Sequence, residues 1–509
     1  MFKTSCPSCG APVSFRSAAS VMAVCAYCNS TLLKDAEAVK DLGKMGQVLE
    51  DYSRIQIPTS GQIDGGRFTV VGRIQLRYDA GFWNEWYVMF DDASTGWLSD
   101  ASGQYVFTRA IAANPRVPGF EQFNPGKVLV HEGKSFYASD VRTAQCTAGE
   151  GELPFKVGTG YEARTVDLRS GSAFMTLDYS DGDSPQQYLG RAVTLEDMQC
   201  QLLRDDDAIK EKAGSVPGRL QALDCPTCGS NIPYVPGIAT QLVCPSCHNG
   251  VDGSSPKAEA LLTMQVLEKH QPTLPLGETG KLDGVEWQVL GALVMCSDDG
   301  EAWGEYLLFN AHAGFLWLVE LADGRWERAR VLNSWPEHWV NSTARVDGTN
   351  YQMLYRYNAT VRYAVGAFNW RVKVGDSQLN ADYANGQQHL SMERTQEEVN
   401  WSASLPLPAA EFTAAFGNRA AGGWLQAFAR SAPRAITAGT PDYTPVDTTY
   451  NPVPTGRVLP DQDLTAIAKL FTGILFVANI AYMDSGLGIG IFIVALIMLW
   501  APLLTGGLG

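Results

Sequence analysis

Two sets of four cysteines with identical spacing constrain this chain more than any other feature of its sequence. The sets are Cys6, Cys9, Cys25 and Cys28, and Cys225, Cys228, Cys244 and Cys247. Each set reads C-x2-C, fifteen intervening residues, C-x2-C, and every cysteine of the second set lies 219 positions after its counterpart. The common offset predicts that the chain of 509 residues contains two copies of one unit.

Four thiolates in this arrangement are typical of a structural zinc site. Two disulfides per set would need an oxidising compartment, and the start of the chain does not resemble a secretory signal. A redox C-x-x-C pair normally occurs singly, near a βαβ pattern. The sequence therefore predicts two structural zinc ions, each with four cysteine ligands and no coordination position left for a catalytic water.

The repeat continues beyond the cysteines. The matching segments are Gly61-Gln62-Ile63-Asp64-Gly65 with Gly280-Lys281-Leu282-Asp283-Gly284, Trp83-Asn84-Glu85-Trp86 with Trp303-Gly304-Glu305-Tyr306, and Trp97-Leu98 with Trp317-Leu318. These segments alternate apolar and polar residues and end at Gly, Asp or Asn, as β-strands do. We expect Asp64 and Asp283, each followed by glycine, to form tight turns.

The predicted fold class is mainly β with some helix. It comprises two β-rich domains, each a sandwich or a small barrel, with two zinc ribbons and C-terminal transmembrane helices. Apolar residues spaced three and four apart predict the connecting helices. The same spacing predicts a helix at the end of each β domain, at Thr194–Lys212 and Pro408–Phe416, and a further helix at Ala420–Ala432. The predicted segments are zinc ribbon 1–33, connecting helix 34–53, β domain 54–213, zinc ribbon 220–253, connecting helix 254–271, β domain 272–432, Pro- and Thr-rich linker 433–462 and transmembrane hairpin 463–504.

The C-terminal segment contains two apolar stretches, Leu464–Met483 and Leu487–Leu504, separated by Asp484-Ser485-Gly486. Each is close to the minimum of about 17 residues that a helix needs to cross a bilayer. The basic residues lie before the first stretch, and the turn has none, which places both ends on the cytoplasmic side. The alternative is one spanning helix with an interfacial or re-entrant second helix.

Charge and motifs exclude several classes of protein. The net charge of −15 disfavours nucleic-acid binding, because phosphate contacts need concentrated Lys and Arg. The sequence lacks a serine nucleophile elbow, a phosphate-binding loop and a dinucleotide-binding glycine motif, and its six histidines form no closely spaced pair. No catalytic residue is predicted.

Trp83, Glu85, Trp303 and Glu305 are the candidate ligand-binding residues. A carboxylate beside aromatic rings can bind a cation such as an amine. The alternative is that the tryptophans anchor the core and the glutamates cap turns or pair across strands.

The motifs G-x-[IL]-D-G, V-[VL]-G, W-x-E-[WY] and W-L together resemble the bacterial domain-of-unknown-function 4178 family, over residues 54–200 and 272–418. Proteins similar to this family often carry zinc ribbons and a C-terminal membrane segment. They tend to accompany membrane-stress proteins and polyamine-related decarboxylase homologues. The resemblance therefore implies a membrane-associated assembly.

The favoured interpretation is a non-enzymatic, membrane-anchored binding or scaffolding protein. It would sit at the bacterial inner membrane, with most of the chain in the cytoplasm and with protein partners there. The alternative is a small-molecule sensor or enzyme, polyamine-like in its ligand, with a site in a β domain. Nucleic-acid binding through the ribbons is the least favoured function.

Overall fold

The structure is a computed structural model of the full chain. It describes residues 2–16, 20–28, 30–35, 38–44, 53–78, 81–101, 103–157, 160–205, 223–232, 241–244, 246–247, 250–252, 260–262, 271–310, 312–340, 342–370, 372–419 and 423–429.

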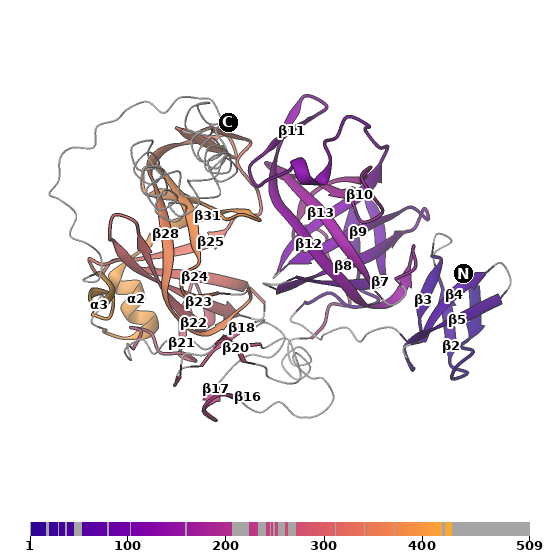
Figure 1. The fold of residues 1–509 in the computed structure, drawn as a ribbon, viewed down its shortest axis with the longest axis horizontal. Helices are drawn as coiled ribbons and strands as arrows, with labels where there is room; N and C mark the ends of the chain where they lie inside the picture. Colours follow the sequence, from indigo (N-terminus) through magenta and orange to yellow (C-terminus); the bar gives the residue numbers. More distant parts are fainter. Residues whose placement is uncertain are drawn as a thin grey trace, which may run out of the picture. The chain divides into compact units, whose positions relative to one another are not determined.

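The first repeat folds into a closed ring of eight antiparallel strands (Figure 1). The ring contains two four-stranded meanders, ordered β7-β8-β9-β10 and β15-β14-β13-β12, which are joined by the β10–β15 and β12–β7 pairings. Its strands are β7 (Gly66–Tyr78), β8 (Gly81–Phe90), β9 (Thr95–Ala101), β10 (Gln104–Ile111), β12 (Lys134–Leu153), β13 (Tyr161–Ser170), β14 (Ala173–Asp178) and β15 (Gln186–Val193). The predicted β-rich domain is therefore a small barrel.

The second repeat has the same order, and its pairing of β28 with β22 closes the ring. Its strands are β22 (Val285–Ser297), β23 (Ala302–Asn310), β24 (Gly314–Glu320), β25 (Trp326–Val331), β28 (Thr349–Phe368), β29 (Ser377–Asn385), β30 (Gln388–Arg394) and β31 (Val399–Leu407). The internal duplication predicted from the sequence thus extends to the connectivity of the strands.

Additional short elements surround the two rings. The strands are β6 (Ser60–Ile63), β11 (Val128–His131), β21 (Thr279–Leu282), β26 (His338–Val340) and β27 (Thr343–Val346), and residues Phe120–Gln122 form a 3-10 helix. The turns between β6 and β7 and between β21 and β22 contain Asp64-Gly65 and Asp283-Gly284, all with positive φ of 50–79°. This is the hairpin geometry that Asp-Gly favours, so the predicted tight turns are confirmed.

The cysteine-rich segments form short hairpins that extend the rings. In the first, β1 (Phe2–Ser5) pairs with β2 (Pro12–Phe15), and β3 (Met22–Val24) pairs with β4 (Ser30–Asp35). Strand β3 also pairs with the end of β12, and Arg16 donates its backbone N–H to Glu152 at 2.6 Å. In the second, β16 (Leu223–Asp224) pairs with β17 (Asn231–Ile232), while β18 (Gln241–Val243) pairs with both β19 (Gly250–Asp252) and β28. Each ribbon is therefore attached to its barrel by strand pairing.

The predicted connecting helices are wrong where the structure describes them. Residues 38–44 form strand β5 (Ala38–Lys44), which pairs with β4, and residues 260–262 form strand β20 (Ala260–Leu262), which pairs with β19. Glycines at positions 43 and 46 lower the helix propensity of the first segment, and an edge strand was available for pairing. Residues 34 and 35 belong to the end of strand β4, and the other residues of both predicted helices lie outside the described ranges, apart from Ser53 and Gln271.

The predictions for the ends of the β domains are confirmed in one copy only. Helix α2 (Ala409–Phe416) and helix α3 (Leu425–Ala429) lie where helices were expected in the second copy. In the first copy, residues 195–199 form turns and the described part of Thr194–Lys212 contains no helix. Leu195 and Met198 are nevertheless buried against the outer face of the barrel. The apolar pattern therefore predicted correctly which side chains are buried, although it did not predict the backbone conformation.

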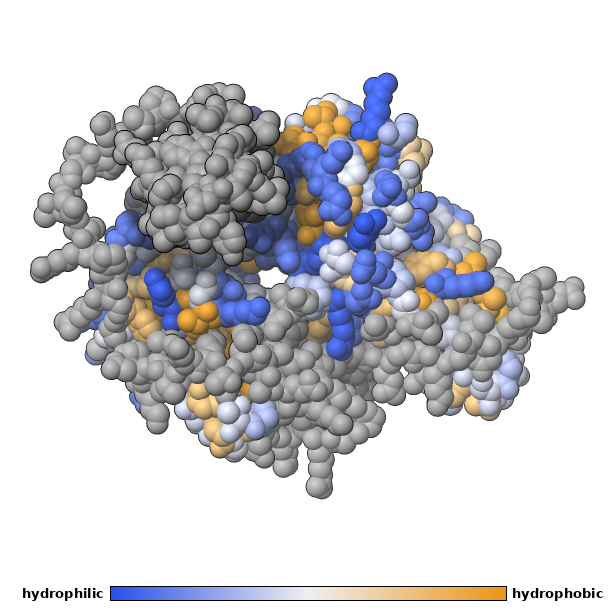
Figure 2. All heavy atoms as spheres, in the orientation of Figure 1, coloured by the Kyte–Doolittle hydropathy of each residue, from blue (hydrophilic) through white to orange (hydrophobic). Residues whose placement is uncertain are grey.

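Packing on the outer faces of the rings accounts for much of the core. In the first copy Phe68, Trp86, Val88, Phe90 and Phe107 pack beneath the segments that precede and follow the ring. The pairing of β7 with β12, which closes the ring, requires glycine at position 72. A Cβ there would lie 1.8 Å from the carbonyl oxygen of Glu152. On the face drawn in Figure 2, the described surface is largely hydrophilic with separate apolar patches.

None of the helices within the described ranges has both the length and the apolar character needed to cross a membrane. The predicted linker 433–462 and transmembrane hairpin 463–504 lie outside those ranges.

Candidate metal centres and barrel interiors

The first cysteine set converges on one point. Turns after β1 and β3 carry its two pairs, and Gly10, with φ of 76°, lets its N–H reach the carbonyl oxygen of Cys6 at 2.8 Å. The Sγ atoms of Cys6 and Cys28 are 3.7 Å apart, as are those of Cys9 and Cys25. All four sulfurs lie within 4.8 Å of one another.

The second set repeats this geometry. The Sγ–Sγ distances are 3.6 Å between Cys225 and Cys247 and 3.7 Å between Cys228 and Cys244. Gly229, with φ of 72°, occupies the place of Gly10 and donates its N–H to the carbonyl oxygen of Cys225 at 2.8 Å. The structure therefore brings together all eight cysteines that the sequence predicted as ligands, in two separate groups.

These sulfur separations fit a tetrahedral metal site. Four sulfurs at about 2.3 Å from one ion have edges of about 3.8 Å, whereas sulfurs in a disulfide are about 2.05 Å apart. All eight cysteines are free thiols here, so the disulfide alternative does not describe this structure. Both groups can hold a metal ion, and four thiolates fill a tetrahedral shell completely.

The candidate ligand-binding residues of the first copy lie inside its barrel. Trp83 donates its indole N–H to Glu85 at 2.8 Å, and the hydroxyl of Ser99 donates to the second carboxylate oxygen at 2.6 Å. Burial, with a smaller contribution from the charges of Asp167 and Asp178, raises the pKa of Glu85 to about 7, although these two hydrogen bonds lower it. Strand β14, which carries Asp178, lies opposite β8 in the ring order, so these charges interact across the interior.

The second copy preserves the same pair. Trp303 donates its indole N–H to Glu305 at 2.7 Å, and burial again raises the pKa of this carboxyl. The two Trp–Glu pairs lie in separate barrels, on β8 and β23, and are not brought together into one site. Their use in ligand binding stays a prediction.

Further acidic residues in the interiors were missed by the sequence analysis. In the first barrel, burial raises the pKa of Asp167 to about 7, with a contribution from Asp140. In the second, Asp382 and Glu393 lie on β29 and β30, and burial raises the pKa of both. A signal was present for Asp167, which lies between two apolar residues of a strand in Val166-Asp167-Leu168, whereas Glu393 is followed by Arg394 and shows no such pattern.

Replacing Glu85 with glutamine is expected to alter the pH dependence of stability. Because the pKa of Glu85 rises from 4.5 to about 7 on folding, its stabilising contribution is complete below pH 4.5 and is lost as pH rises to about 7. Glu85→Gln should therefore gain stability relative to the wild type between pH 5 and pH 8, measured by urea unfolding. The exposed Glu121→Gln is the control, and a constant difference between Glu85→Gln and the wild type would contradict the expectation.

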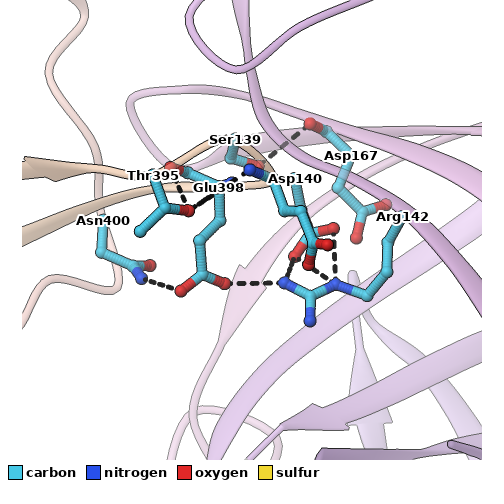
Figure 3. Close-up of polar contacts among 8 residues, drawn as sticks. Ser139, Asp140, Arg142, Asp167, Thr395, Glu398 and Asn400 are labelled. Atoms are coloured by element: carbon cyan, nitrogen blue, oxygen red, sulfur yellow. Dashed lines mark hydrogen bonds and ion pairs between the residues drawn. The ribbon is translucent and has the colours of Figure 1, made fainter. Parts of the chain in front are cut away.

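One charged residue connects the two barrels. Arg142 of β12 binds Asp140 through two nitrogens at 2.6–3.0 Å and reaches Glu398, beside β31, at 2.7 Å (Figure 3). The backbone N–H of Val141 donates to the carbonyl oxygen of Glu397 at 2.8 Å. The ring of Tyr137 lies 5.6 Å from that of Trp339. The barrels thus contact each other through a buried cation, a backbone hydrogen bond and an aromatic pair.

These features define a class: tandem eight-stranded antiparallel barrels, each extended by a four-cysteine ribbon. The family model described as "Domain of unknown function (DUF4178)" matches residues 56–195 and 275–409, which together exceed half of the chain. The chain belongs to this family, and the resemblance seen in its motifs is confirmed. No curated protein and no solved structure matches the chain.

Proposed function

We propose that this protein is a non-enzymatic binding and scaffolding protein that presents two copies of a zinc-stabilised barrel at a membrane. The observation that carries the proposal is that both copies keep two geometries. One is a cysteine tetrad attached to the barrel by strand pairing, and the other is an interior Trp–Glu hydrogen bond. Selection for one binding module, used twice, explains why both features recur.

Zinc is the metal we assign to the cysteine groups. Thiolate ligands favour zinc over calcium and magnesium, and the sulfur separations of 3.6–3.7 Å match the tetrahedral shell that zinc prefers. The ions stabilise ribbons whose own cores are small: that of the first contains Val13, Phe15, Ala23 and Leu32 around two of the cysteines. The zinc ions are structural, because the four thiolates leave no position for a reacting water.

The proposed location is the bacterial inner membrane, with the barrels on the cytoplasmic side. The composition of residues 463–504 supports attachment, and the basic residues before that segment support the orientation. Two joined modules raise the effective concentration of a second binding event when a partner carries repeated or paired sites. We propose protein partners at the membrane and no nucleic-acid partner, given the net charge of −15.

Fractionation combined with cross-linking tests this proposal. The tagged full-length chain should remain with membranes during carbonate extraction, while a chain ending at residue 462 should appear in the soluble fraction. In-cell cross-linking should recover a specific set of membrane-associated proteins with the full chain, and the truncated chain should lose it. Release of the full chain by carbonate, or an identical cross-linked set from both chains, would refute the membrane scaffold.

A small-molecule sensor is the second candidate function. The specific observation that favours it is the group of acidic residues in the barrel interiors, which a purely structural core would replace with apolar side chains.

A further inference from the structure

An open cleft of about 440 Å³ lies where hairpins of the two barrels meet. In the first barrel it is lined by the turn between β11 and β12, at residues 133–135, and by the turn between β13 and β14, at residues 170–172. In the second barrel it is lined by Glu337, His338 and Arg345, beside and within the hairpin of β26 and β27. Its volume lies within the range of small-molecule sites, about 300–1,000 Å³.

Hydrogen bonds between the barrels hold the walls of this cleft together. Trp335 donates its backbone N–H to the carbonyl oxygen of Gly171 at 2.9 Å, and Trp339 donates its own to the hydroxyl of Tyr137 at 3.3 Å. A Cβ at Gly171 would lie 3.4 Å from Cγ of Glu337, so the turn of the first barrel approaches the second closely. The cleft is therefore formed by joined hairpin turns before any ligand binds.

The charged side chains of the cleft carry an excess of positive charge. Lys134 has no ion pair within the described residues, and its ammonium group lies 5.7 Å from the centre of the Phe136 ring. Arg345 binds Glu337 through Nε at 3.0 Å, and no described residue accepts a hydrogen bond from its two terminal nitrogens. With His338 counted as neutral, two positive side chains face one negative side chain. This local excess contrasts with the net charge of −15 for the whole chain.

Three serines, Ser135, Ser170 and Ser172, add hydroxyl groups to the lining. Ser170 is 1% exposed, and within the described part of the chain its hydroxyl makes no hydrogen bond. Buried polar groups normally have a hydrogen-bond partner, so the partner of this hydroxyl has to come from the cleft. A hydroxyl can donate to an anionic oxygen, which adds a neutral donor to the charged ones.

This set of groups fits an anion better than a cation or an apolar compound. Glu337 is the carboxylate among the described lining residues, and it already accepts a hydrogen bond from Arg345. None of those lining residues is aromatic, so the cleft offers no surface on which a ring could stack. The donors lie on three walls, and a phosphate monoester presents three terminal oxygens with a charge of about −1.5 to −2 at pH 7. A carboxylate is planar and offers two oxygens.

We propose that the cleft binds the phosphate group of a phosphate monoester. The ammonium group of Lys134 and the terminal nitrogens of Arg345 donate to its oxygens, and the hydroxyl of Ser170 is a third donor. Lys134 belongs to the first barrel and Arg345 to the second, so the bound phosphate contacts both repeats. This inference goes beyond the proposed scaffold role and does not depend on it. Soluble compounds and lipid headgroups both carry such a group, and the test separates these two sources.

Calorimetric titration of the zinc-loaded full-length chain in non-ionic detergent at pH 7 tests the proposal. The probes are glycerol 3-phosphate and dihexanoylphosphatidic acid, with glycerol and succinate at matched ionic strength as comparisons. We expect saturable binding of at least one phosphate probe, no binding of glycerol, and binding of succinate at least tenfold weaker. Tighter binding of dihexanoylphosphatidic acid identifies a lipid headgroup as the source, and equal or tighter binding of glycerol 3-phosphate identifies a soluble compound.

Substitutions place the binding in the cleft. Lys134→Gln and Arg345→Gln should each weaken binding of the phosphate probe about tenfold, or about 1.4 kcal/mol, because each removes one charged donor. Both side chains are exposed, so the variants should unfold in urea like the wild type. Lys127→Gln is the matched control for lysine, because Lys127 also lies over a phenylalanine ring, at 5.1 Å, but does not line the cleft. Arg191→Gln is the control for an exposed arginine in an ion pair. Both controls should keep the affinity within about twofold.

Four outcomes would overturn the inference. They are no saturable binding of either phosphate probe, equal binding of succinate, unchanged affinity in Lys134→Gln or Arg345→Gln, and an equal loss in the two control variants. The scaffold proposal is tested separately by fractionation and cross-linking, and Arg345→Gln should keep the cross-linked partners of the wild type.

Discussion

Replacing Cys25 with serine is expected to lower the zinc content from two ions per chain to one. Cys25 is fully buried and is one of the four cysteines of the first set, and serine cannot replace a thiolate in a zinc shell. Binding of a structural zinc ion contributes on the order of 10 kcal/mol to small zinc domains, more than their own cores provide. The first ribbon should therefore unfold while the barrels remain folded. Elemental mass spectrometry of protein purified without chelator measures the change.

Hydrogen exchange locates the effect of the same substitution. Strand β3 pairs with β12 at Glu152 and Leu153, so unfolding of the ribbon should expose amides in both segments. Cys244→Ser should produce the matching loss at β18 and β28. Cys200→Ser is the control, because this half-buried cysteine belongs to neither tetrad. Two ions retained by Cys25→Ser, or fewer than two in the wild type, would rule out the assignment.

Arg142→Met is expected to destabilise the protein by about 3 kcal/mol, because it leaves Asp140 and Glu398 without their cation. This expected loss of stability is at the lower end of the range for breaking a buried ion pair, because 34% of the Glu398 side chain is exposed. Arg191→Met is a matched control: Arg191 pairs with Asp64, both are well exposed, and the loss should be at most about 1 kcal/mol. Urea unfolding at pH 7 measures both.

A double substitution separates the charge effect from the loss of packing. Burial raises the pKa of Glu398, and Arg142 counteracts that rise. Adding Glu398→Gln to Arg142→Met should therefore recover part of the lost stability, because it removes the carboxylate left without a partner. Equal losses in Arg142→Met and Arg191→Met would show that the contact between barrels contributes no more than a surface ion pair.

The cysteine ligands were predictable because each C-x2-C pair is a short local motif and the same four-cysteine spacing occurs twice in the chain. A C-x2-C pair closes its own turn, and Gly10 and Gly229 supply the positive φ that the turn needs. The Asp-Gly turns at Asp64 and Asp283 were predictable for the same reason. The connecting helices failed because the apolar spacing between residues 34 and 53 is weak, and pairing with a neighbouring strand outweighed it.

By itself, the sequence determined the duplication, the two cysteine tetrads and the β-rich character of each copy. Only the tertiary structure decided that each copy closes into a barrel, which depends on β12 meeting β7 and β28 meeting β22. It also decided which carboxylates share an interior and that Arg142 reaches Glu398, 256 residues away. Such contacts join segments far apart in the chain, and their free energy comes from burial and charge pairing that exist once the strands have assembled. No local spacing of residues encodes them.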